Sequence, residues 1–208
     1  MARYKLISAE DAEESFGISE KIDYPYQDFE DEQEIRLYDG DQTISGDFGS
    51  DSAQDWNPFN VVVDGDLTVR GTVDWHEWGS GSFLFVTGNV VADNMALHGC
   101  PNVHICGSLR VRGAILGRQG DNGGVLRVEG PTKAELIIAT TDFCMDFESD
   151  VTAVVIGDGD CIQGCKIETT PDDCADYFLP DFLDEDGAVD EEALLEAIHE
   201  GAPYLREE

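Results

Sequence analysis

Apolar and polar residues alternate along the middle of the chain, and glycine interrupts the alternation at a repeating interval. The clearest copy spans residues 61–69, where valine and leucine occupy alternate positions on either side of Gly65. Three further copies surround Gly88, Gly107 and Gly130, so the four glycines are 23, 19 and 23 residues apart. Alternation with a period of two predicts strands that bury one face. Repetition at this interval predicts that each copy forms one turn of a coil and stacks on the next.

Weaker copies around Gly40 and Gly157 extend the repeat, so the coil is expected to span residues 36–160. The expected fold class is all-β: a single-stranded parallel β-helix (a β-solenoid), right-handed, with about five to six turns. An antiparallel sandwich of short strands would also show the alternation. The constant position of glycine within each copy favours the solenoid, because glycine accepts a positive φ at a corner without strain.

Each flank contains one segment with the capping signals of a helix. One segment lies between Ser8 and Gly17, and the other between Asp190 and Gly201. Serine and aspartate accept hydrogen bonds from free N–H groups at a helix start, and glycine accepts the left-handed conformation at its end. We expect both helices to cap the open ends of the coil. The expected organisation is an acidic N-terminal segment, the solenoid, and an acidic C-terminal segment with the terminal helix: 1–35, 36–160 and 161–208.

The chain carries 45 acidic and 12 basic residues, a net charge of −33, and this charge is unevenly distributed. Residues 1–60 have a net charge of −12 and residues 141–208 one of −19, whereas residues 61–140 are nearly neutral at −2. Such a surface repels nucleic acid and anionic membranes. Solubility alone does not require the segregation, so the flanks are expected to contact a basic protein.

Aromatic residues indicate two places where such contact is expected. Residues 75–82 predict a protruding loop, and residues 170–187 combine aromatic side chains with carboxylates. The candidate partner-binding residues are Trp75, His76, Trp78, Tyr177, Phe178, Asp181, Phe182, Asp184, Glu185 and Asp186.

The sequence lacks the motifs of the common catalytic sites. Nucleophile elbows, phosphate-binding loops and metalloprotease helices are not found, and the four histidines define no catalytic triad. The chain is therefore not expected to be an enzyme, and no catalytic or cofactor-binding residue is assigned.

Two groups of side chains contain residue types that bind zinc. In the better group, His98-x-Cys100 is followed by His104-x-Cys106. Ile105 is expected to point inward, which places its two neighbours on the outer surface of the rod rather than in a pocket. The second group lacks the usual spacing of ligands: Cys161, Cys165 and Cys174. No metal site is therefore assigned, and the six cysteines are expected to be reduced thiols.

The basic residues of the middle region are expected to pair with carboxylates of neighbouring turns. The cations are Arg70, Arg110, Arg112, Arg127 and Lys133, and the carboxylates are Asp64, Asp93, Glu129 and Glu135. Stacked ladders of opposite charge would stabilise adjacent turns by a few tenths of a kcal/mol, roughly, per exposed pair. They would leave little positive charge for binding an anion.

No apolar run reaches the roughly 18 residues that a membrane-spanning helix requires. The first residues also lack the long apolar stretch of a secretory signal. A cytoplasmic location is therefore expected.

The glycine-punctuated segments 63–71 and 83–88 resemble those of short bacterial β-solenoid proteins. One such family is the bactofilins, which are polymer-forming cytoskeletal proteins. Another is a set of solenoid proteins encoded beside bacterial polymorphic toxins, and this resemblance implies an immunity protein or an accessory partner. The resemblance covers residues 36–160 and carries over no catalytic residue. The long acidic flanks and the terminal helix depart from the bactofilin pattern.

The expected function is a non-enzymatic, acidic binding protein, monomeric or homodimeric, that binds and neutralises a basic bacterial toxin. Two alternatives remain open. The first is a structural, self-assembling solenoid, which the repeat favours. The second is a carbohydrate-active β-helix enzyme, which rests on analogy of fold.

Overall fold

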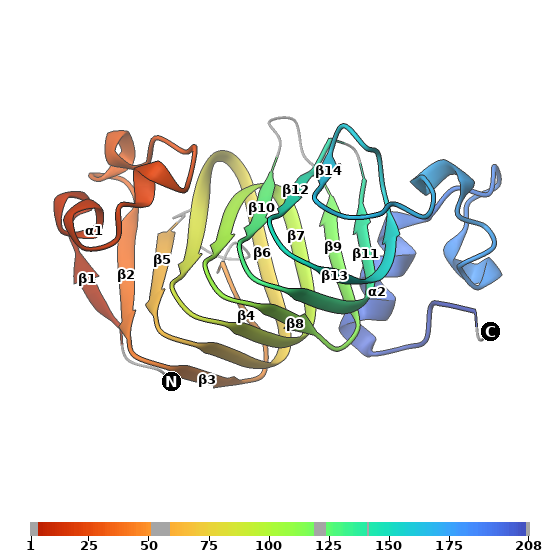
Figure 1. Cartoon of the computed structure of the whole chain (residues 1–208), viewed down its shortest axis with the longest axis horizontal. Helices are drawn as coiled ribbons and strands as arrows, with labels where there is room; N and C mark the ends of the chain where they lie inside the picture. The colour runs from red at the N-terminus through yellow and green to blue at the C-terminus, as the bar shows by residue number, and fades with distance from the viewer. Residues whose placement is uncertain (1–3, 51–58, 119–123, 141, 207–208) are drawn as a thin grey trace.

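The computed structural model describes residues 4–50, 59–118, 124–140 and 142–206. Within them, fourteen strands form one continuous sheet that coils around a single axis (Figure 1). The strands of the coil pair in parallel, each with the equivalent strand of the next turn. The fold is therefore the β-solenoid that the repeat predicted, with about five turns.

Three faces of the coil are distinguished by the strands that stack on them. The first face contains β2 (Glu34–Asp39), β5 (Phe59–Asp64), the ends of β6 (Leu67–Val86) and β7 (Val90–Ile105), β10 (Val125–Val128), β12 (Cys144–Phe147) and β14 (Ile162–Gln163). The second face contains β3 (Gln42–Ser45), the starts of β6 and β7, β8 (Leu109–Val111), and the starts of β11 (Thr132–Ala139) and β13 (Val151–Ile156). The third face contains β4 (Phe48–Gly49), the middle of β6 and β7, β9 (Ala114–Arg118), and the ends of β11 and β13.

The core is a column of inward side chains contributed by successive turns. On the first face, residues in register along the column are all buried: Val61, Leu84, Val103, Leu126, Met145 and Ile162. Each of these residues occupies an inward position of its strand, and inward and outward positions alternate along each strand as the period-two pattern predicted. The column accounts for the stability of the coil, because a single turn cannot remove its apolar face from water.

The repeated glycines stack directly on one another at the corner after the first face. The amide of Gly107 donates to Gly88 O at 3.0 Å, and that of Gly130 donates to Gly107 O at 3.0 Å. A β-carbon on either residue would overlap the backbone of the preceding turn. Gly65 has a positive φ, but Gly88, Gly107 and Gly130 do not lie in the left-handed region. Close backbone approach, rather than a positive φ, therefore explains these three glycines.

Both expected helices are present, with the expected caps. Helix α1 (Ala9–Phe16) begins after Ser8, whose Oγ accepts from the amide of Asp11, and ends at Gly17 in the left-handed conformation. Helix α2 (Glu191–Glu200) begins after Asp190, whose carboxylate accepts from the amides of residues 192 and 193, and ends at Gly201. At the N-terminal end of the sheet, β1 (Lys5–Ile7) pairs antiparallel with β2 and covers its edge.

The helices lie near the two ends of the coil, but each packs on the outside of one face (Figure 1). Helix α1 and the 3₁₀ turns η1 (Ile18–Glu20) and η2 (Tyr26–Phe29) cover outward residues of the first face, including Val62, Phe83 and Phe85. Helix α2 and the turn η4 (Pro180–Phe182) cover outward residues of the third face, including Leu116 and Ile138. These outward positions are apolar and need a second layer.

Candidate functional site

The predicted loop at residues 75–82 is part of a continuous strand, and Trp75 belongs to the core. Its indole is fully buried and its Nε1 donates to Ser82 Oγ at 2.9 Å. The expectation of an exposed contact at this residue is therefore corrected: an apolar side chain at an inward position is buried by the neighbouring turns. His76 points outward and is half-buried. The side chain of Trp78 lies outside the described residues.

The acidic C-terminal candidates divide into packed aromatic residues and exposed carboxylates. Phe178 is fully buried in the cluster beneath α2, and Tyr177 and Phe182 are partly buried against the same cluster. These rings attach the segment to the third face. The carboxylates between and after them are exposed: Asp181, Asp184, Glu185 and Asp186.

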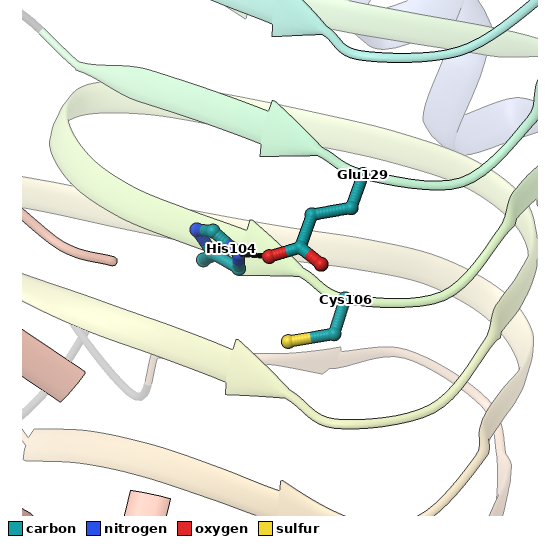
Figure 2. A group of neighbouring side chains, drawn as sticks. All are labelled: His104, Cys106 and Glu129. Atoms are coloured by element: carbon teal, nitrogen blue, oxygen red, sulfur yellow. Dashed lines mark hydrogen bonds and ion pairs between the residues drawn. The ribbon is translucent and has the colours of Figure 1, made fainter. Parts of the chain in front are cut away.

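His104, Cys106 and Glu129 form a compact cluster on the first face (Figure 2). His104 ends β7 together with Ile105, Cys106 follows at the corner, and Glu129 occupies the equivalent corner one turn later. One potential ligand atom from each lies within 4.8 Å of the other two. Among the described residues, no other set of three histidine, cysteine, aspartate or glutamate side chains places its ligand atoms this close together.

The N-terminal segment covers this cluster and completes its hydrogen bonds. His104 Nδ1 lies 3.2 Å from Lys21 O and its Nε2 lies 2.9 Å from Glu129 Oε1. Lys21 Nζ donates to the same carboxylate oxygen at 2.6 Å. His104 is therefore 1% exposed, whereas the sequence predicted a side chain on the bare surface of the rod. His104 and Cys106 do share the outer face, as predicted.

Burial and the neighbouring hydrogen-bond donors act in opposite directions on the pKa of Glu129. Burial disfavours the ionised form of Glu129, but hydrogen bonds from Lys21 and His104 outweigh it and lower the pKa of Glu129. The hydrogen bond to Glu129 raises the pKa of Lys21. Burial, together with the charge of Glu129, raises the pKa of the Cys106 thiol. Cys106 and Lys21 also line a pocket of about 520 Å³ between the N-terminal segment and the coil.

A second polar cluster lies on the third face, where the carboxylate of Asp74 meets two histidines and a third histidine packs against one of them. Asp74 Oδ1 lies 2.9 Å from His76 Nε2, and Asp74 Oδ2 lies 3.7 Å from His199 Nε2 on α2. The rings of His76 and His98 meet edge to face, with centroids 5.2 Å apart. Arg118, in register with His98, pairs with Glu191 at 3.3 Å. The sequence did not predict this cluster, because its residues come from four distant segments.

The stability of the fold is expected to depend on pH because of the environment of His98. Burial, reinforced by Arg118 and His76 and opposed by Asp74, lowers the pKa of His98 to about 4 from 6.5. The unfolded chain therefore binds a proton that the folded chain rejects as the pH falls from about 6.5 to 4, so stability contributed above that window is lost within it. The uptake of one proton can lower the free energy of unfolding by at most about 1.4 kcal/mol per pH unit. Solvent screening of the half-buried ring makes the actual loss smaller.

The measurement compares the melting temperatures of the wild type and a His98→Gln variant from about pH 7 to about pH 5. The variant lacks the titrating ring, so its melting temperature is expected to rise relative to that of the wild type as the pH falls. A difference that stays constant with pH would contradict a lowered pKa.

The expected ladders of opposite charge are present in part. Arg112 pairs with Asp93 of the preceding turn at 3.0 Å, and Arg127 pairs with Asp146 of the following turn at 3.3 Å. Glu129 pairs with Lys21 and His104 instead of a rung cation. Three exposed cations of the second face have no carboxylate within 4 Å among the described residues: Arg70, Arg110 and Lys133.

Comparisons of the chain with protein-family models, with curated proteins and with solved structures gave no match. Among the described residues, no helix combines the length and the hydrophobicity that a membrane crossing requires. No disulfide joins the six cysteines.

Proposed function

We propose that this protein is a non-enzymatic binding protein, and that the acidic surface of residues 142–206 engages a basic protein partner. The observation that carries the proposal is the exposure of carboxylates that lack cationic neighbours. In this stretch, the described carboxylates within 4 Å of a lysine or arginine nitrogen are Asp146, Glu168 and Glu191. Uncompensated like charges destabilise the folded chain, and a basic partner would relieve that repulsion.

The way in which the acidic segment is held also supports this proposal. Phe178 is anchored in the cluster beneath α2, and the amide of Arg206 donates to Tyr177 O at 2.9 Å. Arg206 Nε also donates to Phe178 O at 2.6 Å. Carboxylates on a packed segment lose less conformational freedom on binding than carboxylates on a loose tail. A preorganised acidic surface therefore suits a specific protein partner.

We further propose that the basic partner is a toxin and that binding occludes its active surface, as an immunity protein does. Charge complementarity supports this finer proposal: many basic surfaces bind nucleic acid, and a protein of net charge −33 presents a competing anionic surface. Such binding is fast at low ionic strength and weakens with salt.

The test compares two variants that remove the same number of charges. The first carries Asp176→Asn, Asp181→Asn, Glu185→Gln and Asp186→Asn, all at exposed positions of the C-terminal segment. The matched control carries Asp23→Asn, Asp28→Asn, Asp31→Asn and Glu32→Gln, which are exposed on the N-terminal segment. The partner is first isolated by affinity capture from the native host at low salt and identified after elution with high salt.

Association rates of the purified partner are then measured over a range of ionic strength. We expect the C-terminal variant to associate about tenfold more slowly at low salt, with the rates converging at high salt. The control variant is expected to change the rate less. Recovery of the chain alone, or a rate insensitive to both salt and the C-terminal substitutions, would overturn the proposal.

A further inference from the structure

We propose that His104, Cys106 and Glu129 form a zinc-binding site beneath the N-terminal segment. The three side chains supply a nitrogen, a sulfur and an oxygen, each a ligand type that zinc accepts. They come from two adjacent turns of the coil, with their ligand atoms mutually within 4.8 Å. The site is independent of the acidic surface assigned to partner binding.

The orientation of His104 is the first argument for a ligand rather than a packed ring. A carbonyl oxygen can only accept, so the contact of 3.2 Å to Lys21 O requires a proton on Nδ1. This leaves Nε2 directed toward Glu129. Histidines that bind metals commonly donate their other N–H group to a carbonyl or a carboxylate, which sets the orientation of the ring. Phe85 stacks on the ring, with centroids 5.6 Å apart, and restricts it further.

The separation of the ligand atoms is the second argument. Zinc bonds of roughly 2.0–2.3 Å at tetrahedral angles place neighbouring ligand atoms about 3.3–3.7 Å apart. His104 Nε2 and Glu129 Oε1, which are 2.9 Å apart, would separate slightly, and ligand atoms as far apart as the limit of 4.8 Å would approach by about 1 Å, so only small shifts of the three side chains are required. Figure 2 shows the Cys106 thiol and the Glu129 carboxylate on the same side of the coil as the imidazole. Water from the pocket beside Cys106 would supply the fourth ligand.

Lys21 occupies the place of a cation in this cluster. Its Nζ lies 2.6 Å from Glu129 Oε1, and its side chain is 41% exposed. Zinc binding would release the Nε2 proton of His104 and the thiol proton of Cys106, and the ammonium group would move into solvent. The ammonium group of Lys21 therefore competes with zinc for Glu129. Its backbone carbonyl accepts from His104 Nδ1 and so orients the ring for metal binding.

The test uses cobalt as a spectroscopic probe and zinc in competition with a chromophoric chelator. The wild type is expected to bind one equivalent of Co²⁺ with a thiolate-to-cobalt charge-transfer band. Cys106→Ser is expected to abolish the band and to weaken zinc binding by at least about tenfold. The matched control is Cys144→Ser, at an exposed cysteine elsewhere in the coil, and this variant is expected to retain both properties.

A Lys21→Met variant distinguishes a metal site from a merely structural cluster. It keeps the backbone carbonyl and removes the competing ammonium group, so zinc is expected to bind more tightly to it than to the wild type. A variant that only lost stability would not gain affinity. The inference is overturned if the wild type binds no zinc, if the band survives in Cys106→Ser, or if Lys21→Met binds zinc no better than the wild type.

Discussion

Replacement of Trp75 with alanine is expected to lower the free energy of unfolding by about 3–5 kcal/mol. The indole is fully buried and packs against the rings of Phe48 and Phe59, with centroids 6.0 and 5.9 Å away. Its loss would leave a cavity inside the coil and an unpaired hydroxyl on Ser82. The turns around the cavity cannot close it, because each is hydrogen-bonded to its neighbours in a fixed register.

Chemical denaturation of the variant and the wild type measures this loss. Val91→Ala is the matched control, because Val91 lies on the second face with 42% of its surface exposed. The control is expected to change stability by no more than about 0.5 kcal/mol. If Trp75 were an exposed contact for a partner, its removal would leave stability unchanged and weaken binding. A loss below about 1 kcal/mol would contradict the core position of the indole.

Gly99→Ala is expected to destabilise the protein by about 2–4 kcal/mol, from backbone strain together with overpacking. Gly99 has a φ of +84°, which residues with a side chain rarely adopt. A β-carbon there would also overlap the backbone carbonyl of Glu77, the residue in register with it on β6. The carbonyl belongs to the neighbouring turn and cannot move without breaking the stacking of β6 on β7.

Gly40→Ala separates the two contributions. Gly40 has a similar φ of +76°, but an added β-carbon would have no atom within 4 Å. Its substitution is therefore expected to cost about 1–2 kcal/mol from backbone strain alone. The difference between the two variants in denaturant unfolding measures the overlap with Glu77. Equal losses would show that the close approach of the two turns contributes nothing.

The spacing of the repeat also predicts which residues of the zinc cluster lie together, whereas the local motif of histidines and cysteines does not. The interval between Gly107 and Gly130 sets the register of the two turns and places Cys106 opposite Glu129. This pairing is deducible once the coil is accepted, because equivalent positions of successive turns stack. The local motif grouped His104 and Cys106 with His98 and Cys100 rather than with Glu129, and His98 and Cys100 lie across a corner from His104.

Two features of the clusters depend on segments far from the repeat. Lys21 reaches Glu129 across 108 residues, and His199 reaches Asp74 from the last helix. No periodicity relates these segments to the rungs that they contact. The outward apolar residues Phe83, Phe85 and Leu116 are covered by these flanking segments, and the alternation within the rungs does not identify which segment covers which face.

The sequence by itself determined the parallel coil, its inward column of valine, leucine and isoleucine, and the caps of both helices. Each of these follows from interactions between residues at a fixed spacing, so a repeated pattern specifies them directly. Tertiary structure alone decided that Trp75 is buried, that the N-terminal segment covers His104, and that α2 brings a second histidine to Asp74. These outcomes depend on which apolar surface each flank buries, and that choice is made by the packing of whole faces rather than by local spacing.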